Sequence, residues 1–199
     1  MEEIIITKSS RCYSEIDSLI IVMAALSLSM DYKHSGKANY NPGDYLVAEG
    51  LSTGKMVRLP LYGPIEAVLM NKKPDQITLT VEKKSPPTVR YETHTDALKQ
   101  TVNYIITPYF VTFYENNSNH AVSKFGSDYT KWPSTWRMGW VVRNALSHNG
   151  KIFFKNLTTP AIDWNGIIVT TAFQHKPIHD IFSFADILLL LLEMETELN

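Results

Sequence analysis

Two strongly apolar segments limit what this chain can fold into. One runs from Leu19 to Leu28 and the other from Ile187 to Leu192. Both are shorter than the roughly 20 residues that span a bilayer, and acidic residues stand close to both, so we expect buried helices and no membrane segment. A helix that is apolar on most of its circumference must be covered by several neighbours or by a second copy of the chain. A homodimer is therefore one expectation from the sequence.

The spacing of apolar residues predicts a mainly helical protein. Long helices are expected at about residues 13–30, 96–114, 134–148 and 184–198. Ser14 and Ser134 are the expected N-caps of the first and third helices, and Asn149-Gly150 is a typical helix end. Pro108 should bend or split the second helix, and a polar loop at 116–119 should follow it.

Proline and glycine interrupt residues 32–90 every few positions, which predicts an irregular insertion with only a short helix near 65–70. The alternation Ile77, Leu79, Val81 fits either a brief strand or a turn, and periodicity alone leaves both open. After the third long helix, residues 151–155 and 167–173 are rich in β-branched and aromatic side chains. Asn165-Gly166 between them is a tight-turn signal, so a small β-hairpin is expected there.

Length and composition favour one domain over residues 1–199. The chain is 44% hydrophobic, which suits one sizeable core better than two small ones, and it contains no repeat or low-complexity linker. The net charge of -1 argues against a generally basic nucleic-acid coat, so a polyanion would have to bind a local patch. Cys12 is the single cysteine, and the first residues do not resemble a secretion signal. We therefore expect a cytoplasmic protein.

The third long helix carries the residues of greatest chemical interest. Viewed down its axis, the small and aliphatic residues between 138 and 146 form an ordinary core face. The other side carries Trp136, Trp140, Asn144 and Ser147, with Arg143 and His148 at its margins. Two tryptophans four residues apart would leave a large apolar patch in water, so the insertion or another subunit should cover them. The sequence thus predicts a partly closed cleft with aromatic walls.

The polar residues beside this cleft suit a phosphodiester substrate. Histidine is the side-chain type best suited to move protons near neutral pH, so His148 is the expected proton-transfer group, and Arg143 is a permanent cation that can hold oxygens on which charge develops. Such chemistry needs no metal and no cofactor. A basic zone surrounds the helix, because residues 124–155 carry six lysines and arginines against Asp128 alone, and this zone suits an RNA backbone.

The stretch Arg143-Asn144-Ala145-Leu146-Ser147-His148 resembles the Arg-x4-6-His motif of the HEPN superfamily, in the form with a polar residue directly after the arginine. The resemblance implies a HEPN-like helical bundle that acts as a metal-independent endoribonuclease. In that family two copies of the motif face each other across a homodimer, and the RNA 2′-hydroxyl attacks the adjacent phosphate. It also implies roles in defence or toxin–antitoxin biology, with an antitoxin protein as a possible partner.

Carried over by residue, the resemblance makes His148 the acid or base, Arg143 the group that stabilises charge, and Asn144 an orienting amide. Substrate contacts are expected from Ser147, Trp140, Trp136 and Lys151. The alternative is a non-catalytic helical module for dimerisation or for binding RNA or nucleotides, in which Arg143 and His148 serve only the helix end. A metal site at His175, His179 and Asp180 is not expected, because Pro177 disturbs their spacing.

Overall fold

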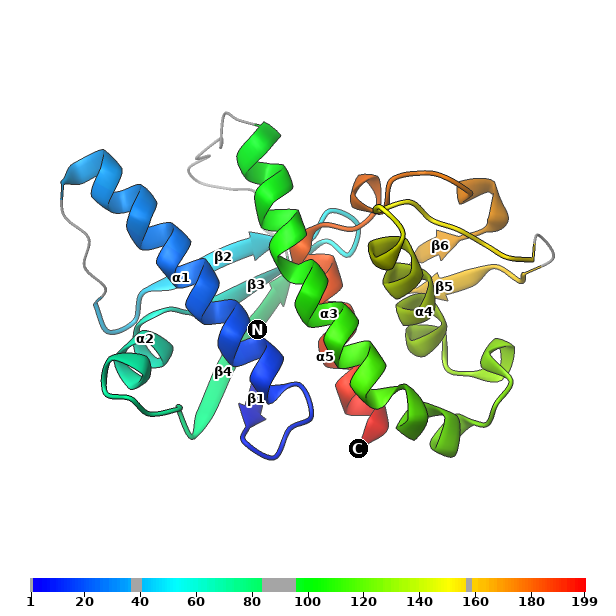
Figure 1. Cartoon of the computed structure of the whole chain (residues 1–199), viewed down its shortest axis with the longest axis horizontal. Coiled ribbons are helices and arrows are strands. Elements are labelled where there is room, and N and C mark those ends of the chain that lie inside the picture. Colours follow the sequence, from blue (N-terminus) through cyan, green and yellow to red (C-terminus); the bar gives the residue numbers. More distant parts are fainter. Residues whose placement is uncertain (1, 37–40, 84–95, 157–158) are drawn as a thin grey trace.

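The computed structural model of the chain describes residues 2–36, 41–83, 96–156 and 159–199 (Figure 1). A four-stranded sheet on one side is separated from a small hairpin region on the other by the helices α3 and α5. The helices are α1 (Tyr13–Ser35), α2 (Tyr62–Leu69), α3 (Asp96–Phe125), α4 (Ser134–Ser147) and α5 (Phe184–Leu198). The strands are β1 (Glu2–Thr7), β2 (Tyr45–Glu49), β3 (Lys55–Pro60), β4 (Gln76–Lys83), β5 (Ile162–Trp164) and β6 (Ile167–Val169).

The larger sheet is antiparallel throughout, in the order β1-β4-β3-β2. The residues Ile77, Leu79 and Val81 of β4 are buried, whereas the residues between them are partly exposed. This is the two-residue period of a strand with one face on the core. Ile6 of β1 lies opposite Ile77, and Val57 of β3 lies opposite Val81, so neighbouring strands contribute to the same apolar face. The alternation in β4 is therefore a strand and not a turn.

The prediction of a mainly helical, HEPN-like bundle is wrong, because the protein is a mixed α and β structure. Helix makes up 53% of the structure, but a four-stranded antiparallel sheet contributes one apolar face to the core. The segment predicted as an irregular insertion contains three of the four strands and α2 within its described part, residues 41–83. Its prolines and glycines stand mainly between these elements, where they separate short strands. The strand β1 was not predicted at all.

The helix α5 is central to the packing. It contacts α3 and α4 on one side and β2 and β3 on the other, and nearly all of its residues from Phe184 to Leu192 are buried. This confirms that the second apolar segment is a buried helix. One chain covers it completely, so its apolar surface does not by itself require a second copy.

The helix α1 packs beside α3 in front of the sheet (Figure 1). Over Tyr13–Met30 it is as long and as apolar as a membrane span, which the shorter apolar run in the sequence did not indicate. Within this window 44% is buried inside the protein, and the helix contacts α3 and α2. A core helix of a soluble protein or a signal sequence can have the same length and apolar composition as a membrane span, so α1 is only weak evidence for a membrane segment.

Several predicted helix boundaries differ from the structure. Helix α3 runs unbroken through Pro108 and through residues 116–119, where a loop was expected. Pro108 is exposed, so the helix accommodates its ring on the solvent side. The N-cap positions of α1 and α4 are Cys12 and Pro133, and neither predicted serine cap is used.

The expected β-hairpin is present around Asn165-Gly166, where both residues have positive φ values, 51° and 80°. Its first strand is β5, however, and not residues 151–155. That segment instead runs beside residues 174–178, where Lys151 forms a β-bridge with Pro177 and the Ile152 amide donates to the Lys176 carbonyl at 3.0 Å. The sequence pattern identified the turn correctly but assigned the wrong partner to residues 151–155.

Candidate functional site at the end of α4

The predicted aromatic cleft along α4 is absent, because this helix is buried on two sides. It packs against α3 and α5 on one side and β5 on the other (Figure 1). Trp136 is 0% exposed, its indole nitrogen donates to the Met194 carbonyl at 3.2 Å, and other aromatic rings surround it. A Cβ atom at Gly139 would lie 2.5 Å from the Met194 sulfur, so a larger residue there would require the Met194 side chain of α5 to move. Trp136 therefore belongs to the core and cannot contact a substrate.

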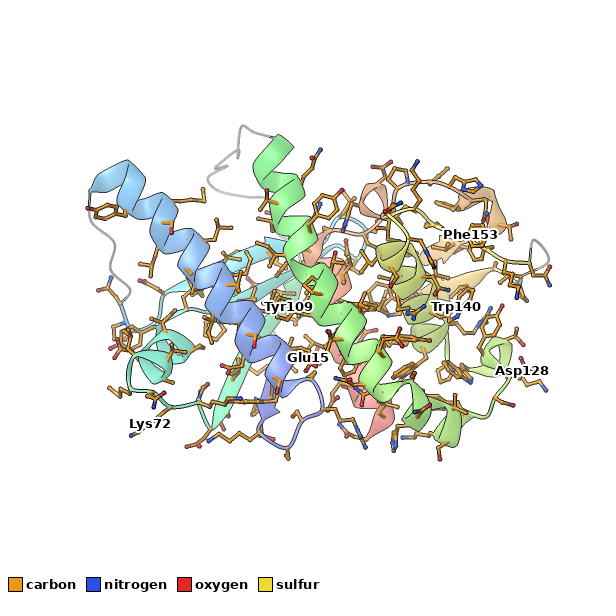
Figure 2. All side chains as sticks on the ribbon, in the orientation of Figure 1. Glu15, Lys72, Tyr109, Asp128, Trp140 and Phe153 are labelled. Carbon is orange, nitrogen blue, oxygen red and sulfur yellow. The ribbon has the colours of Figure 1, made fainter. Side chains whose placement is uncertain are left out.

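Trp140 is half-buried and is already covered by another ring. Its indole stacks on Tyr129, with 4.8 Å between ring centroids and 22° between their planes. Tyr129 follows α3 in a short 3₁₀ helix, Tyr129–Lys131. Figure 2 shows Trp140 on the side of α4 that faces away from α1. The second tryptophan is thus also engaged within the chain.

Arg143 is oriented by two neighbouring side chains. Its Nε and one terminal nitrogen bond to Glu115 of α3, and its other terminal nitrogen donates to the Asn144 side-chain oxygen at 2.8 Å. The guanidinium carbon lies 6.0 Å from the centre of the Tyr114 ring, and burial raises the pKa of Tyr114, so this hydroxyl stays protonated. The arginine has five N–H groups, three of which are used in these bonds. Two N–H groups of a fixed, partly exposed guanidinium remain for another ligand.

His148 lies at the C-cap of α4, and its imidazole is exposed. Its backbone amide donates to the Ala145 carbonyl at 3.1 Å, and Asn149 and Gly150 then turn the chain with positive φ values of 57° and 71°. Backbone bonds therefore hold this helix end, and the side chain takes no part. Among the residues that the structure describes, the imidazole has no hydrogen bond or ion pair. The structure joins Arg143 to Asn144 but leaves His148 separate from both.

A basic and aromatic surface follows His148. Lys151, Phe153 and Lys155 are exposed, and the residues between them, Ile152 and Phe154, are buried. The Phe153 ring, labelled in Figure 2, lies 6.3 Å from the ring of His175 on the neighbouring segment. Residues 149–162 include no aspartate or glutamate. Ser147 is exposed at the start of this surface, so Ser147 and Lys151 are both accessible, as predicted substrate contacts must be.

A hollow of about 400 Å³ lies beside the same helix end. It is lined by Tyr104 and Thr107 from α3 and by Leu146, Ser147, Asn149 and Gly150. The residues on α3, including Glu115, were missed by the sequence analysis. They stand 28 or more positions before Arg143, and no local pattern links them to it.

The residues considered for a metal site do not form one. His179 packs against the Tyr104 ring, its Nδ1 lies 3.4 Å from the Phe182 carbonyl, and burial lowers the pKa of its imidazole. His175 lies instead against Phe153. Within the described ranges, no three histidine, cysteine or acidic side chains are grouped as metal ligands.

Comparison with known proteins adds no family to this picture: no family model, no curated protein and no solved structure matches the chain. The fold and site define a mixed α and β protein in which Arg143 and an exposed His148 lie at the end of one helix.

Proposed function

We propose that this chain is a metal-independent endoribonuclease with His148 as its proton-transfer group. The observation that supports this most strongly is the exposed imidazole, which has no bonded partner in the described part of the chain and follows, five residues on, a guanidinium that Glu115 and Asn144 already orient. An exposed imidazole whose ring nitrogens are not engaged in other bonds can transfer a proton to or from a substrate, as acid–base catalysis requires. The resemblance to the HEPN superfamily covers the Arg143–His148 motif and its place at a helix end, and it does not extend to the fold.

In the proposed reaction, His148 accepts the proton of an RNA 2′-hydroxyl as its oxygen attacks the neighbouring phosphorus. The bond from phosphorus to the 5′-oxygen breaks, and this oxygen takes up a proton. The products are a 2′,3′-cyclic phosphate and a free 5′-hydroxyl. The two remaining N–H groups of Arg143 would bind the non-bridging oxygens as negative charge develops on them, and Asn144 would keep the guanidinium in place.

One chain supplies one imidazole at this site, whereas the reaction uses a base and an acid. A homodimer that brings two His148 side chains together would provide both, and we propose this assembly. A cytoplasmic location is part of the same proposal, since the buried Cys12 forms no disulfide. A role in defence with an antitoxin partner rests on the resemblance alone.

RNA as the substrate is supported by the surface that begins at His148. Lys151 and Lys155 would neutralise phosphates, and the exposed Phe153 ring between them offers a face on which an unpaired base can stack. A single-stranded substrate fits this arrangement better than a duplex, whose bases are not free to stack on protein.

The alternative is a non-catalytic module for dimerisation or RNA binding. The ion pair between Arg143 and Glu115 favours it, because this pair alone would give the arginine a purely structural role. The two proposals differ in what happens when the imidazole is removed.

The test measures cleavage of single-stranded RNA in EDTA by wild type and by His148→Ala. General acid–base catalysis contributes about 10²- to 10⁴-fold in rate, so the variant should lose that much activity while keeping its melting temperature. His120→Ala is the matched control, because His120 is an exposed histidine on α3 outside the site and should cleave normally. Equal cleavage by wild type and His148→Ala, or no cleavage by either, would reject the nuclease and leave the binding module.

A further inference from the structure

The hollow beside His148 has the size of a small-molecule site. Its volume of about 400 Å³ lies within the range of roughly 300–1,000 Å³ typical of ligand pockets. Ser147 and Asn149, the residues directly before and after His148, both line it. The His148 side chain does not itself line the hollow, so a group bound there would share the helix end with the proposed catalytic imidazole.

The backbone around this hollow presents unpaired hydrogen-bond acceptors. Pro108 has no N–H, so the Tyr104 carbonyl lacks its usual helical donor. At the end of α4, the Gly150 amide donates to Ala145 at 2.8 Å and the Lys151 amide donates to His148 at 3.3 Å. These bonds bypass the carbonyls of Leu146 and Ser147, which have no donor among the described residues.

These acceptors select the kind of ligand that fits. Carbonyls at a helix C-terminus point along the helix axis, and Asn149 and Gly150, which follow the end of α4, also line the hollow. The end of α4 also carries the negative pole of the helix dipole. Both effects favour a ligand that donates hydrogen bonds and disfavour a phosphate in the hollow itself. The phosphate would lie outside, toward Arg143 and Lys151.

Tyr104 supplies an aromatic wall that is held in place. Its ring is 58% exposed and packs edge to face against His179, with 5.5 Å between the centroids and an angle of 86°. His179 is itself fixed by the Phe182 carbonyl, and burial keeps its imidazole neutral by lowering its pKa. An exposed ring with a fixed neighbour is a surface on which a flat heterocycle can stack.

We infer that this hollow binds one unpaired nucleobase of the RNA and prefers a base with an exocyclic amino group. The base would stack on Tyr104, and its amino group would donate to the carbonyls of Leu146 and Ser147. Adenine, cytosine and guanine carry such a group, whereas uracil has a carbonyl oxygen where cytosine has its amino group. The inference rests on the proposed function for the phosphate at His148, but binding of the base can be measured without catalysis.

Cytidine and uridine form a matched pair of probes, because they differ at this one position. Chemical shifts of the protein are followed by NMR during titration with each nucleoside. Cytidine should bind about tenfold more tightly than uridine. Its amino group would donate a hydrogen bond to a carbonyl of the hollow, whereas the corresponding carbonyl oxygen of uridine would repel that carbonyl. Ser147→Trp, which fills the hollow, should abolish binding of cytidine. Asn119→Trp, at an exposed position toward the other end of α3, is the control and should bind as wild type does.

Equal affinity for the two nucleosides, or no binding of either, would overturn the inference. Cleavage is measured separately, with single-stranded RNA that carries cytidine or uridine before the scissile phosphate. Binding of cytidine without any cleavage would reject the nuclease but support the base site. Equal rates of cleavage after cytidine and after uridine would support the nuclease and overturn the base site.

Discussion

The Asp186 carboxylate holds the turn between β2 and β3 against the N-terminus of α5, and its removal should strongly destabilise the protein. This carboxylate is completely buried. It accepts hydrogen bonds from the backbone amides of Leu51, Ser52, Thr53 and Ser183 and from the Thr53 hydroxyl, at 2.6 to 3.3 Å. One side chain therefore satisfies donors from the start of α5 and from a turn that lies 133 to 135 residues before Asp186 in the chain.

The expected loss follows from the number and type of these bonds. Hydrogen bonds to a charged group contribute about 1.5–3 kcal/mol each, and a carboxylate near a helix N-terminus adds about 0.3–1 kcal/mol. In Asp186→Ala the freed turn can rotate toward water and recover part of this loss. We therefore expect the free energy of unfolding to fall by about 4 kcal/mol, near the upper end for a single substitution.

The assay is urea denaturation of wild type and Asp186→Ala, followed by circular dichroism and tryptophan fluorescence. Asp75→Ala is the control, because the ion pair of Asp75 with Lys8 is exposed and its loss should leave the denaturation midpoint nearly unchanged. Gly50→Ala should also destabilise the protein, since its Cβ would lie 2.7 Å from an Asp186 oxygen and 2.2 Å from the Thr53 hydroxyl. A loss below about 1.5 kcal/mol for Asp186→Ala would refute this reasoning.

Two further predictions concern carboxylates on α3 and α1. Glu115→Gln should change stability by less than about 1 kcal/mol, because its ion pair is partly exposed, but should lower kcat for RNA cleavage about 10²-fold with KM unchanged as Arg143 loses its orientation. An unchanged kcat would show that Glu115 does not position Arg143. Burial, with a smaller contribution from Glu195, raises the pKa of Glu15 above its usual 4.5, so the folded state binds the proton more tightly and stability should fall as pH rises through this range. Glu15→Gln should flatten this fall in denaturation curves measured from pH 4 to 7, and a slope equal to that of wild type would contradict it.

Local patterns predicted the helices well. The apolar run near the C-terminus is a buried helix, and Asn149-Gly150 ends α4 as expected. Both signals lie within a few residues of the structure that they specify. Residues 41–83 were misread because Pro and Gly mark the ends of short strands as readily as they mark irregular loops. Only pairing with distant strands shows which of the two is present.

For α4, which carries the Arg143–His148 motif, the sequence likewise predicted local features but not contacts with other helices. Its helical period placed Asn144 and Ser147 on one side, but it could not show that Trp136 would be enclosed by α3 and α5. An apolar side chain looks the same in the sequence whether a neighbouring helix or a ligand covers it.

The sequence by itself determined where the four long helices lie, though not all of their boundaries, and the position of an arginine, an asparagine and a histidine at one helix end. Only the tertiary structure decided that Glu115 and Asn144 would hold Arg143, that His148 would remain open, and that Tyr104 would complete a hollow beside it. The physical reason is that helix periodicity and end signals act over a few residues. Ion pairs, burial and cavities depend instead on contacts between segments that the sequence keeps far apart.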